Sequence, residues 1–141
     1  MLGLWRTLSA RDWDAIGDHL TEDCIYVDMP VGPTLAARGP DDIVKRLRVG
    51  LAGLASYENH DGRIVADDEV VMYEHSETWT FGTGEVVELP FVTVHRVRDG
   101  SVSLWKDYWD FGSVVSAAPP DWLERLGSAD TSWVYDATGR L

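Results

Sequence analysis

The sequence has few cysteines, few basic residues and no long apolar run. Cys24 is the one cysteine in 141 residues, which excludes an intrachain disulfide and a metal cluster built from several cysteines. No apolar run approaches the roughly 20 residues that a membrane-spanning helix needs. Residues 1–9 also lack the basic segment and apolar core of a signal peptide. We therefore expect a cytoplasmic protein with no membrane partner.

Basic residues are outnumbered two to one by acidic residues. Lys and Arg total 12 and Asp and Glu total 24, which gives a formal net charge of −12. Nucleic-acid binding depends on Lys and Arg side chains that neutralise phosphates, so we expect no nucleic-acid partner. The sequence also contains no Gly-rich phosphate loop and no Gly-x-Ser-x-Gly nucleophile motif.

Aromatic residues are what the sequence has in plenty. A chain with 45% hydrophobic and 26% charged residues suits one globular domain. Seven Trp and five Tyr are many for this length, and rings with a polar edge often line ligand pockets. We therefore expect a small apolar molecule as the binding partner.

Helical signals come first along the chain and strand signals follow. Ser9 and the apolar residues after it predict a capped amphipathic helix that ends near Leu20. Pro40 and the acidic residues beside it open a second helix. Strands are expected over residues 24–29, 56–65, 69–81, 85–97 and 101–111. Helices followed by an antiparallel meander indicate an α+β domain.

The end of the chain differs from the rest. Pro119 and Pro120 interrupt it, and residues 121–126 have the pattern of a short helix. Trp122, Trp133 and Tyr135 are too apolar for a free tail. We therefore divide the chain into a domain of residues 1–112 and a tail of residues 113–141 that docks on the body or on a partner subunit.

Strand parity places a histidine and two carboxylates on one face of the predicted sheet. His75, Glu77 and Trp79 point the same way from one strand, and Trp105 and Asp107 share a face of another. Burying such groups without partners is costly. The cluster is therefore either a satisfied ion-pair network or an acid–base site in which neighbouring carboxyl pKa values are driven apart.

Short hairpin turns on both sides of strand 85–97 predict the register. Two-residue turns would place His75 opposite Val92 and Val92 opposite Asp107. These three residues would form one row, with Glu77 diagonal to it. His95 lies on the other face by parity, so we expect it at the surface or in a dimer contact. A β-bulge would shift the row by one residue.

Three segments resemble limonene-1,2-epoxide hydrolase and the SnoaL-like proteins of the nuclear transport factor 2-like superfamily. They are Tyr-Val-Asp-Met-Pro at 26–30, Glu-His-Ser-Glu at 74–77 and Trp-Lys-Asp-Tyr-Trp-Asp at 105–110. The resemblance covers about residues 4–112. It implies a cone-shaped, cystatin-like fold, in which a curved, mostly antiparallel sheet packs on N-terminal helices around a deep pocket. It also implies a homodimer and chemistry without cofactor or metal.

Carried over by position, the resemblance implies roles for five residues. Asp107 matches the Asp that activates water, and Tyr26 matches the Tyr that holds it. Glu77 stands where an Asp protonates the epoxide oxygen. Two positions depart from the pattern, since His75 replaces an Arg and Asp28 replaces an Asn. Arg is a permanent cation with five donors, whereas His is titratable and has at most two.

Three functions are compatible with these residues. The first is a cofactor-free acid–base enzyme that adds water to an epoxide on a small, mostly apolar substrate, with Asp107 as base, Glu77 as acid and His75 as their bridging partner. The second is SnoaL-like cyclisation or ketosteroid-isomerase-like proton transfer next to a carbonyl, for which His75 could be the base. The third is a non-catalytic small-molecule-binding module. The expected substrate- or water-binding residues are Tyr26, Asp28, Trp79, Val92 and Trp105.

Overall fold

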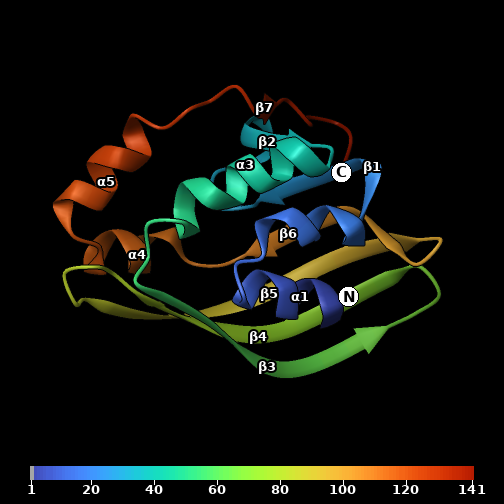
Figure 1. The fold of residues 1–141 in the computed structure, drawn as a ribbon. Helices are drawn as coiled ribbons and strands as arrows, with labels where there is room; N and C mark the ends of the chain where they lie inside the picture. Colours follow the sequence, from blue (N-terminus) through green and yellow to red (C-terminus); the bar gives the residue numbers. More distant parts are fainter. Residues whose placement is uncertain (1) are drawn as a thin grey trace.

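A curved sheet forms one layer of the protein (Figure 1). The computed structural model describes residues 2–141, and its seven strands lie in the order β3-β4-β5-β6-β1-β2-β7. Neighbouring strands are antiparallel, except that β1 and β6 are parallel. The strands are β1 (Leu20–Asp28), β2 (Ala36–Arg38), β3 (Ser56–Ala66), β4 (Val70–Thr80), β5 (Val86–Arg98), β6 (Ser101–Tyr108) and β7 (Val134–Tyr135).

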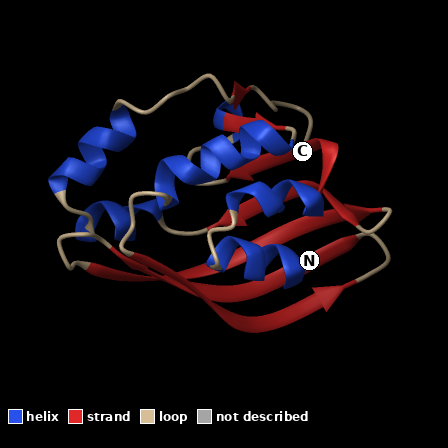
Figure 2. Cartoon of the chain, viewed as in Figure 1, coloured by secondary structure: helices blue, strands red, loops and turns tan. Residues whose placement is uncertain are grey.

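The helices lie on one side of this sheet (Figure 2). They are α1 (Leu2–Ser9), α2 (Trp13–Ile16), α3 (Pro40–Leu51), α4 (Phe111–Ala117) and α5 (Pro120–Gly127), with 3-10 turns at Gly17–His19 and Pro33–Leu35. The main core lies between them and the inner face of the sheet. The predicted α+β class with a curved, mostly antiparallel sheet is therefore confirmed.

The helix predicted from Ser9 to about Leu20 forms only in part, as α2 and the 3-10 turn at Gly17–His19. Arg11 adopts a positive φ of 52°, a conformation that interrupts a right-handed helix. The predicted continuous helix capped by Ser9 is therefore wrong. Ser9 instead ends α1, which buries Leu4, Trp5 and Leu8 against the sheet. Trp5 thereby becomes a central core residue, in ring contact with strands β4 and β6.

The β4–β5 hairpin has a longer loop than predicted. Phe81 and Glu85 close a loop of residues 82–84, and Gly84 has a φ of 103°. A three-residue loop with glycine in the left-handed region is a common hairpin connection. It shifts the register by one residue, so that His75 lies opposite Phe91.

A bulge shifts the next pairing as well. The turn at Asp99 and Gly100 has the predicted two residues, but the β5–β6 register slips between Arg96 and Val97. Thr93 therefore lies opposite Asp107. The prediction that Val92 points inward is wrong: its side chain is on the outer face and 40% exposed. The surface position predicted for His95 is also wrong. Because Val92 is on the outer face, alternation places His95 on the inner face, where it is fully buried.

The tail packs on the body of its own chain. After α5 it returns along α3 to β7, which pairs with β2 and forms the edge of the sheet (Figure 1). Trp122 and Trp133 are buried and Tyr135 is partly buried. The boundary near residue 112 stays a prediction. No helix within residues 2–141 is long and apolar enough to span a membrane.

Candidate active site

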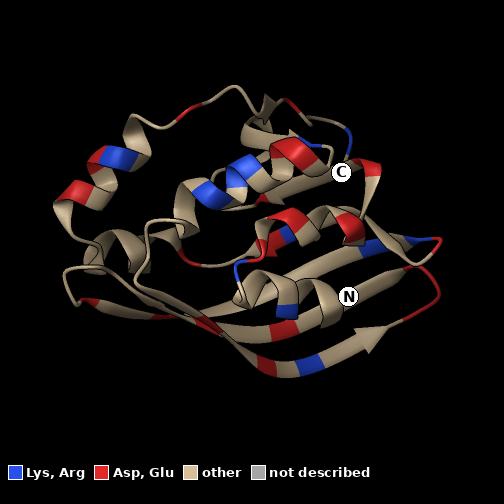
Figure 3. Ribbon diagram, in the orientation of Figure 1, with Lys and Arg blue, Asp and Glu red and all other residues tan. Residues whose placement is uncertain are grey.

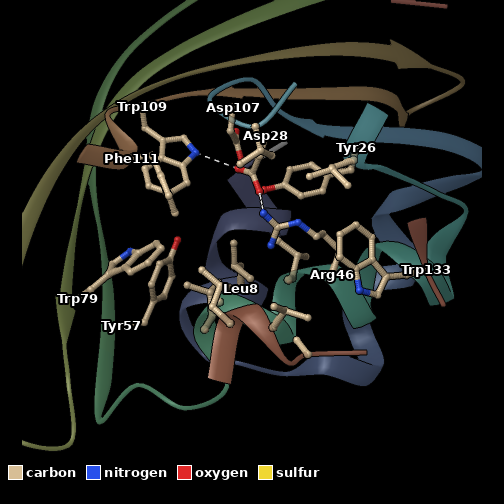
Figure 4. Close-up of a pocket in the computed structure, with 18 of the residues that line it drawn as sticks. Leu8, Tyr26, Asp28, Arg46, Tyr57, Trp79, Asp107, Trp109, Phe111 and Trp133 are labelled. Atoms are coloured by element: carbon tan, nitrogen blue, oxygen red, sulfur yellow. Dashed lines mark hydrogen bonds and ion pairs between the residues drawn. The ribbon is translucent and has the colours of Figure 1, made fainter. Parts of the chain in front are cut away.

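A cavity of about 290 Å³ lies between the inner face of the sheet, α3 and the tail. Its lining is mainly apolar, and a few charged groups converge in it (Figure 4). The aromatic residues of the lining are Trp5, Tyr26, Tyr57, Trp79, Phe91, Trp109, Phe111, Trp122 and Trp133. The charged residues are Asp28, Arg46, Glu77, Asp107 and Asp130. An apolar concavity with few polar groups is the usual form of a small-molecule site.

Glu77 is a buried carboxyl on the inner face of β4. Its Oε1 accepts a hydrogen bond from the Tyr57 hydroxyl at 2.6 Å, and its Oε2 accepts one from the Trp79 indole at 2.8 Å. Burial raises the pKa of Glu77 to about 8, despite these two hydrogen bonds, and the charges of Asp107 and Asp28 raise it further. Glu77 therefore holds a proton at neutral pH, and either oxygen has a second lone pair that can carry it.

Asp107 is the second buried carboxyl, at the end of β6. Its Oδ1 accepts hydrogen bonds from the Thr93 hydroxyl at 2.5 Å and the Trp105 indole at 2.7 Å. With two donors on Oδ1, the oxygen left to take a proton is Oδ2. Burial raises the pKa of Asp107 to about 7, the charge of Asp28 raises it further, and the hydrogen bonds from Thr93 and Trp105 lower it.

Asp28 enters the cavity from β1, paired with a residue that sequence reasoning missed. It forms an ion pair with Arg46 of α3, and the side chains are only 5% and 14% exposed. Its other oxygen accepts a hydrogen bond from the Trp109 indole at 2.9 Å (Figure 4). The Arg46 guanidinium also lies 5.4 Å from the ring centre of Trp133. The cavity therefore does contain a guanidinium, although it comes from a helix and not from β4.

A sequence signal for Arg46 existed. Ile43 and Leu47 form the apolar stripe of α3, and Arg46 is three residues from Ile43, so it lies beside that stripe. Basic residues gather on this helix (Figure 3). Arg46 is the one among them that lines the cavity, whereas Lys45 pairs with Asp42 at the surface. Helical spacing could have identified it as half-buried.

His75 does not line the cavity. Its ring stacks on Tyr73 and lies 4.4 Å from the Trp5 ring. Its Nε2 is 3.1 Å from the Thr93 hydroxyl, which separates it from Asp107. Burial lowers the pKa of His75 to about 4, so it is neutral at physiological pH and cannot replace the charge of an arginine.

The remaining predicted site residues fall into three groups. Tyr26 and Trp79 line the cavity, and burial, Asp28 and Asp107 keep the pKa of Tyr26 well above its usual value, so its hydroxyl stays protonated. Trp105 is fully buried behind Asp107 and acts on the site through its hydrogen bond. Val92 lies on the opposite face of the sheet, away from the cavity.

Within residues 2–141, no group of three or more His, Cys, Asp or Glu side chains is placed to hold a metal ion.

Comparisons with known proteins establish the family. The chain belongs to the SnoaL-like domain family, whose model matches residues 3–105. It is 26% identical over 103 residues to the epoxide hydrolase EphG of Mycobacterium tuberculosis, an alignment that covers 73% of this chain and 66% of that protein. The chain thus spans slightly less than two thirds of this relative. The match to the family ends before Asp107 and the tail.

Solved structures support the same fold. The structure of a LEH-like epoxide hydrolase from Mycobacterium tuberculosis is 24% identical, with a TM-score of 0.67 over 89% of this chain and 87% of that chain. A candidate SnoaL-like polyketide cyclase from Shewanella putrefaciens is 15% identical, with a TM-score of 0.72 over 82% and 90% of the two chains. The predicted nuclear transport factor 2-like fold is therefore confirmed.

Proposed function

We propose that the protein is a cofactor-free acid–base enzyme that adds water to an epoxide on a small, mostly apolar substrate. The observation that carries the proposal is the pair of buried carboxyls, Glu77 and Asp107, in one aromatic cavity. Their pKa values, about 8 and about 7, are raised to the range in which one can hold a proton while the other accepts one. The similarity to an epoxide hydrolase of Mycobacterium tuberculosis supports the choice of reaction.

In the proposed reaction one carboxyl accepts a proton from water and the other donates a proton to the epoxide oxygen. Asp107 Oδ2 takes a proton from a water molecule, and Tyr26 beside it helps to orient that water. The water oxygen bonds to one epoxide carbon as the bond from that carbon to the epoxide oxygen breaks. Glu77 gives its proton to the released oxygen, which yields a diol. Proton exchange with solvent then returns a proton to Glu77 and removes one from Asp107.

A second reaction is favoured by Arg46. A buried guanidinium in an apolar cavity can stabilise negative charge that develops on a substrate oxygen. Asp107 could then remove a proton next to a carbonyl while Arg46 stabilises the enolate, as in a cyclase or isomerase. Because Asp28 already neutralises Arg46, we favour epoxide hydration, which requires no such free cation.

A substrate panel tests the proposal. Wild-type protein is offered small cyclic epoxides and, separately, carbonyl compounds with an acidic C–H bond. We expect diol formation from at least one epoxide and no proton exchange in the carbonyl compounds. Turnover of only the carbonyl compounds would favour the cyclase or isomerase. Binding of both sets without turnover, measured by quenching of the cavity tryptophans, would leave a binding module and contradict the proposal.

The outer face of the sheet supports the predicted homodimer, which stays a prediction. Five apolar side chains there are at least 40% exposed, and no helix within residues 2–141 covers them (Figure 2). They are Val65, Met72, Val86, Val92 and Tyr108. The cytoplasmic location also stays a prediction.

A further inference from the structure

A chain of hydrogen bonds runs from His75 to Asp107 behind the cavity. His75 Nε2 lies 3.1 Å from Thr93 Oγ1, and Thr93 Oγ1 lies 2.5 Å from Asp107 Oδ1. All three side chains are on the inner face of adjacent strands, with exposed fractions of 4%, 0% and 3%. Thr93 does not line the cavity, so it cannot contact a ligand there directly. Its hydroxyl is hydrogen-bonded to Asp107 and to the His75 imidazole.

The direction of each hydrogen bond follows from the number of protons available. A threonine hydroxyl has one proton and can donate once. When Asp107 is ionised it can only accept, so the Thr93 proton points to Asp107. Thr93 must then accept from His75, and the proton on the neutral imidazole is at Nε2. His75 Nδ1, which has no protein partner, is the bare nitrogen.

This arrangement separates the two oxygens of Asp107. Oδ1 receives the Thr93 hydroxyl and the Trp105 indole, which occupy both of its lone pairs. Oδ2 is free of these donors, so it is the basic oxygen. Rotation of the carboxyl would break two buried hydrogen bonds, and an unpaired buried donor is costly.

We propose that Thr93 and His75 are positioning residues for Asp107, which hold Oδ1 in place so that Oδ2 is presented to the cavity as the proton acceptor. The inference rests on the proposed role of Asp107 as the base. In this role His75 is neither a cationic bridge nor a base. Its Nε2–H donates a hydrogen bond to the Thr93 hydroxyl, and the proton stays on the ring. Thr93 takes no part in the resemblance to epoxide hydrolases described above.

The charged and titratable groups around Asp107 come from several elements. Tyr26 and Asp28 approach from β1, Arg46 from α3, Tyr57 from β3 and Glu77 from β4. None of them is changed when Thr93 or His75 is replaced. A change in the protonation of Asp107 in these variants can therefore be attributed to the chain of hydrogen bonds.

The test is an NMR titration of the Asp107 carboxyl in ligand-free protein that carries ¹³C-labelled aspartate, with Asp107→Asn to assign the signal. Thr93→Val removes the donor but keeps the shape, and we expect it to raise the pKa of Asp107 by about 1 to 2, the usual effect of one hydrogen bond to a charged group. Thr93→Ser should restore the wild-type value. His75→Phe should raise the pKa by less, since Thr93 can still donate.

Two further variants make the test specific. The double variant His75→Phe/Thr93→Val should match Thr93→Val alone, because His75 acts only through Thr93. His95→Phe is the matched control. His95 is a buried imidazole against the Trp5 and Trp105 rings but has no hydrogen-bond partner. Phenylalanine keeps a ring in the same place, so the pKa of Asp107 should not change. Thr93→Ala replaces Thr93→Val if the latter does not fold.

Three results would overturn the inference. They are an unchanged pKa of Asp107 in Thr93→Val, additive effects of His75→Phe and Thr93→Val, and equal effects of His75→Phe and His95→Phe. The titration needs no turnover, so it is independent of the proposed function. One combination of results separates the two proposals: Asp107→Asn retains turnover, but Thr93→Val raises the Asp107 pKa. The hydrogen-bond chain would then exist, but Asp107 would not be the base. The proposed function and the positioning role of Thr93 would both be contradicted.

Discussion

Asp107→Asn is expected to lower epoxide turnover by about 10²- to 10⁴-fold, the usual contribution of a general base. An amide of nearly the same shape can keep the Oδ1 hydrogen bonds to Thr93 and Trp105, but it cannot take a proton at neutral pH. The loss should therefore appear in kcat, with little change in substrate binding or in the melting temperature. Steady-state kinetics, ligand binding and thermal unfolding measure the three quantities.

Asp99→Asn provides the control for this variant. Asp99 lies in the exposed turn between β5 and β6 with a φ of 52°, a conformation that asparagine tolerates. This variant removes the same carboxylate charge far from the cavity, so wild-type turnover is expected. An active Asp107→Asn protein, or a similar loss in both variants, would contradict the role of Asp107.

Arg46→Met is expected to lower the free energy of unfolding by about 3–5 kcal/mol, because removing one partner of a buried ion pair leaves the other charge uncompensated. Asp28 would then be a lone carboxylate in a cavity that already holds Glu77 and Asp107. Trp133 would also lose the cation above its ring. Urea unfolding at neutral pH measures the change.

Two variants separate this effect from loss of packing. Arg48→Met makes the same substitution at an exposed position of α3 near Trp13, where we expect a loss of about 1 kcal/mol or less. Asp28→Asn combined with Arg46→Met removes both charges, and it should be more stable than Arg46→Met alone. If the double variant is no more stable, the uncompensated charge is not the cause.

The strands were predictable from the sequence because alternation does not depend on how strands pair. Glu77 points inward with Trp79, and Asp107 points inward with Trp105, whatever the register between β4, β5 and β6. The register itself depends on two local details, the three-residue loop that ends at Gly84 and the bulge at Arg96. Each moves the pairing by one residue, which is why Thr93 and not Val92 lies beside Asp107.

The sequence could not predict that Arg46 and the tail reach the cavity. The resemblance to epoxide hydrolases directs attention to His75, since an arginine stands at that position in the family. Helical spacing identifies the apolar stripe of α3, but whether a residue at its edge reaches a cavity depends on how the helix is rotated against the sheet. That rotation, and the position of Trp133 over Arg46, are set by tertiary packing.

The pH dependence of kcat/KM for epoxide hydration tests the central claim most directly. Activity requires ionised Asp107 and protonated Glu77. It should therefore rise with pH as Asp107 loses its proton, near a pKa of about 7, and fall as Glu77 loses its own, near a pKa of about 8. The two apparent values belong to the interacting pair. A bell-shaped profile with its maximum between them is predicted, and activity that stays constant from about pH 6 to about pH 9 would contradict an acid–base pair.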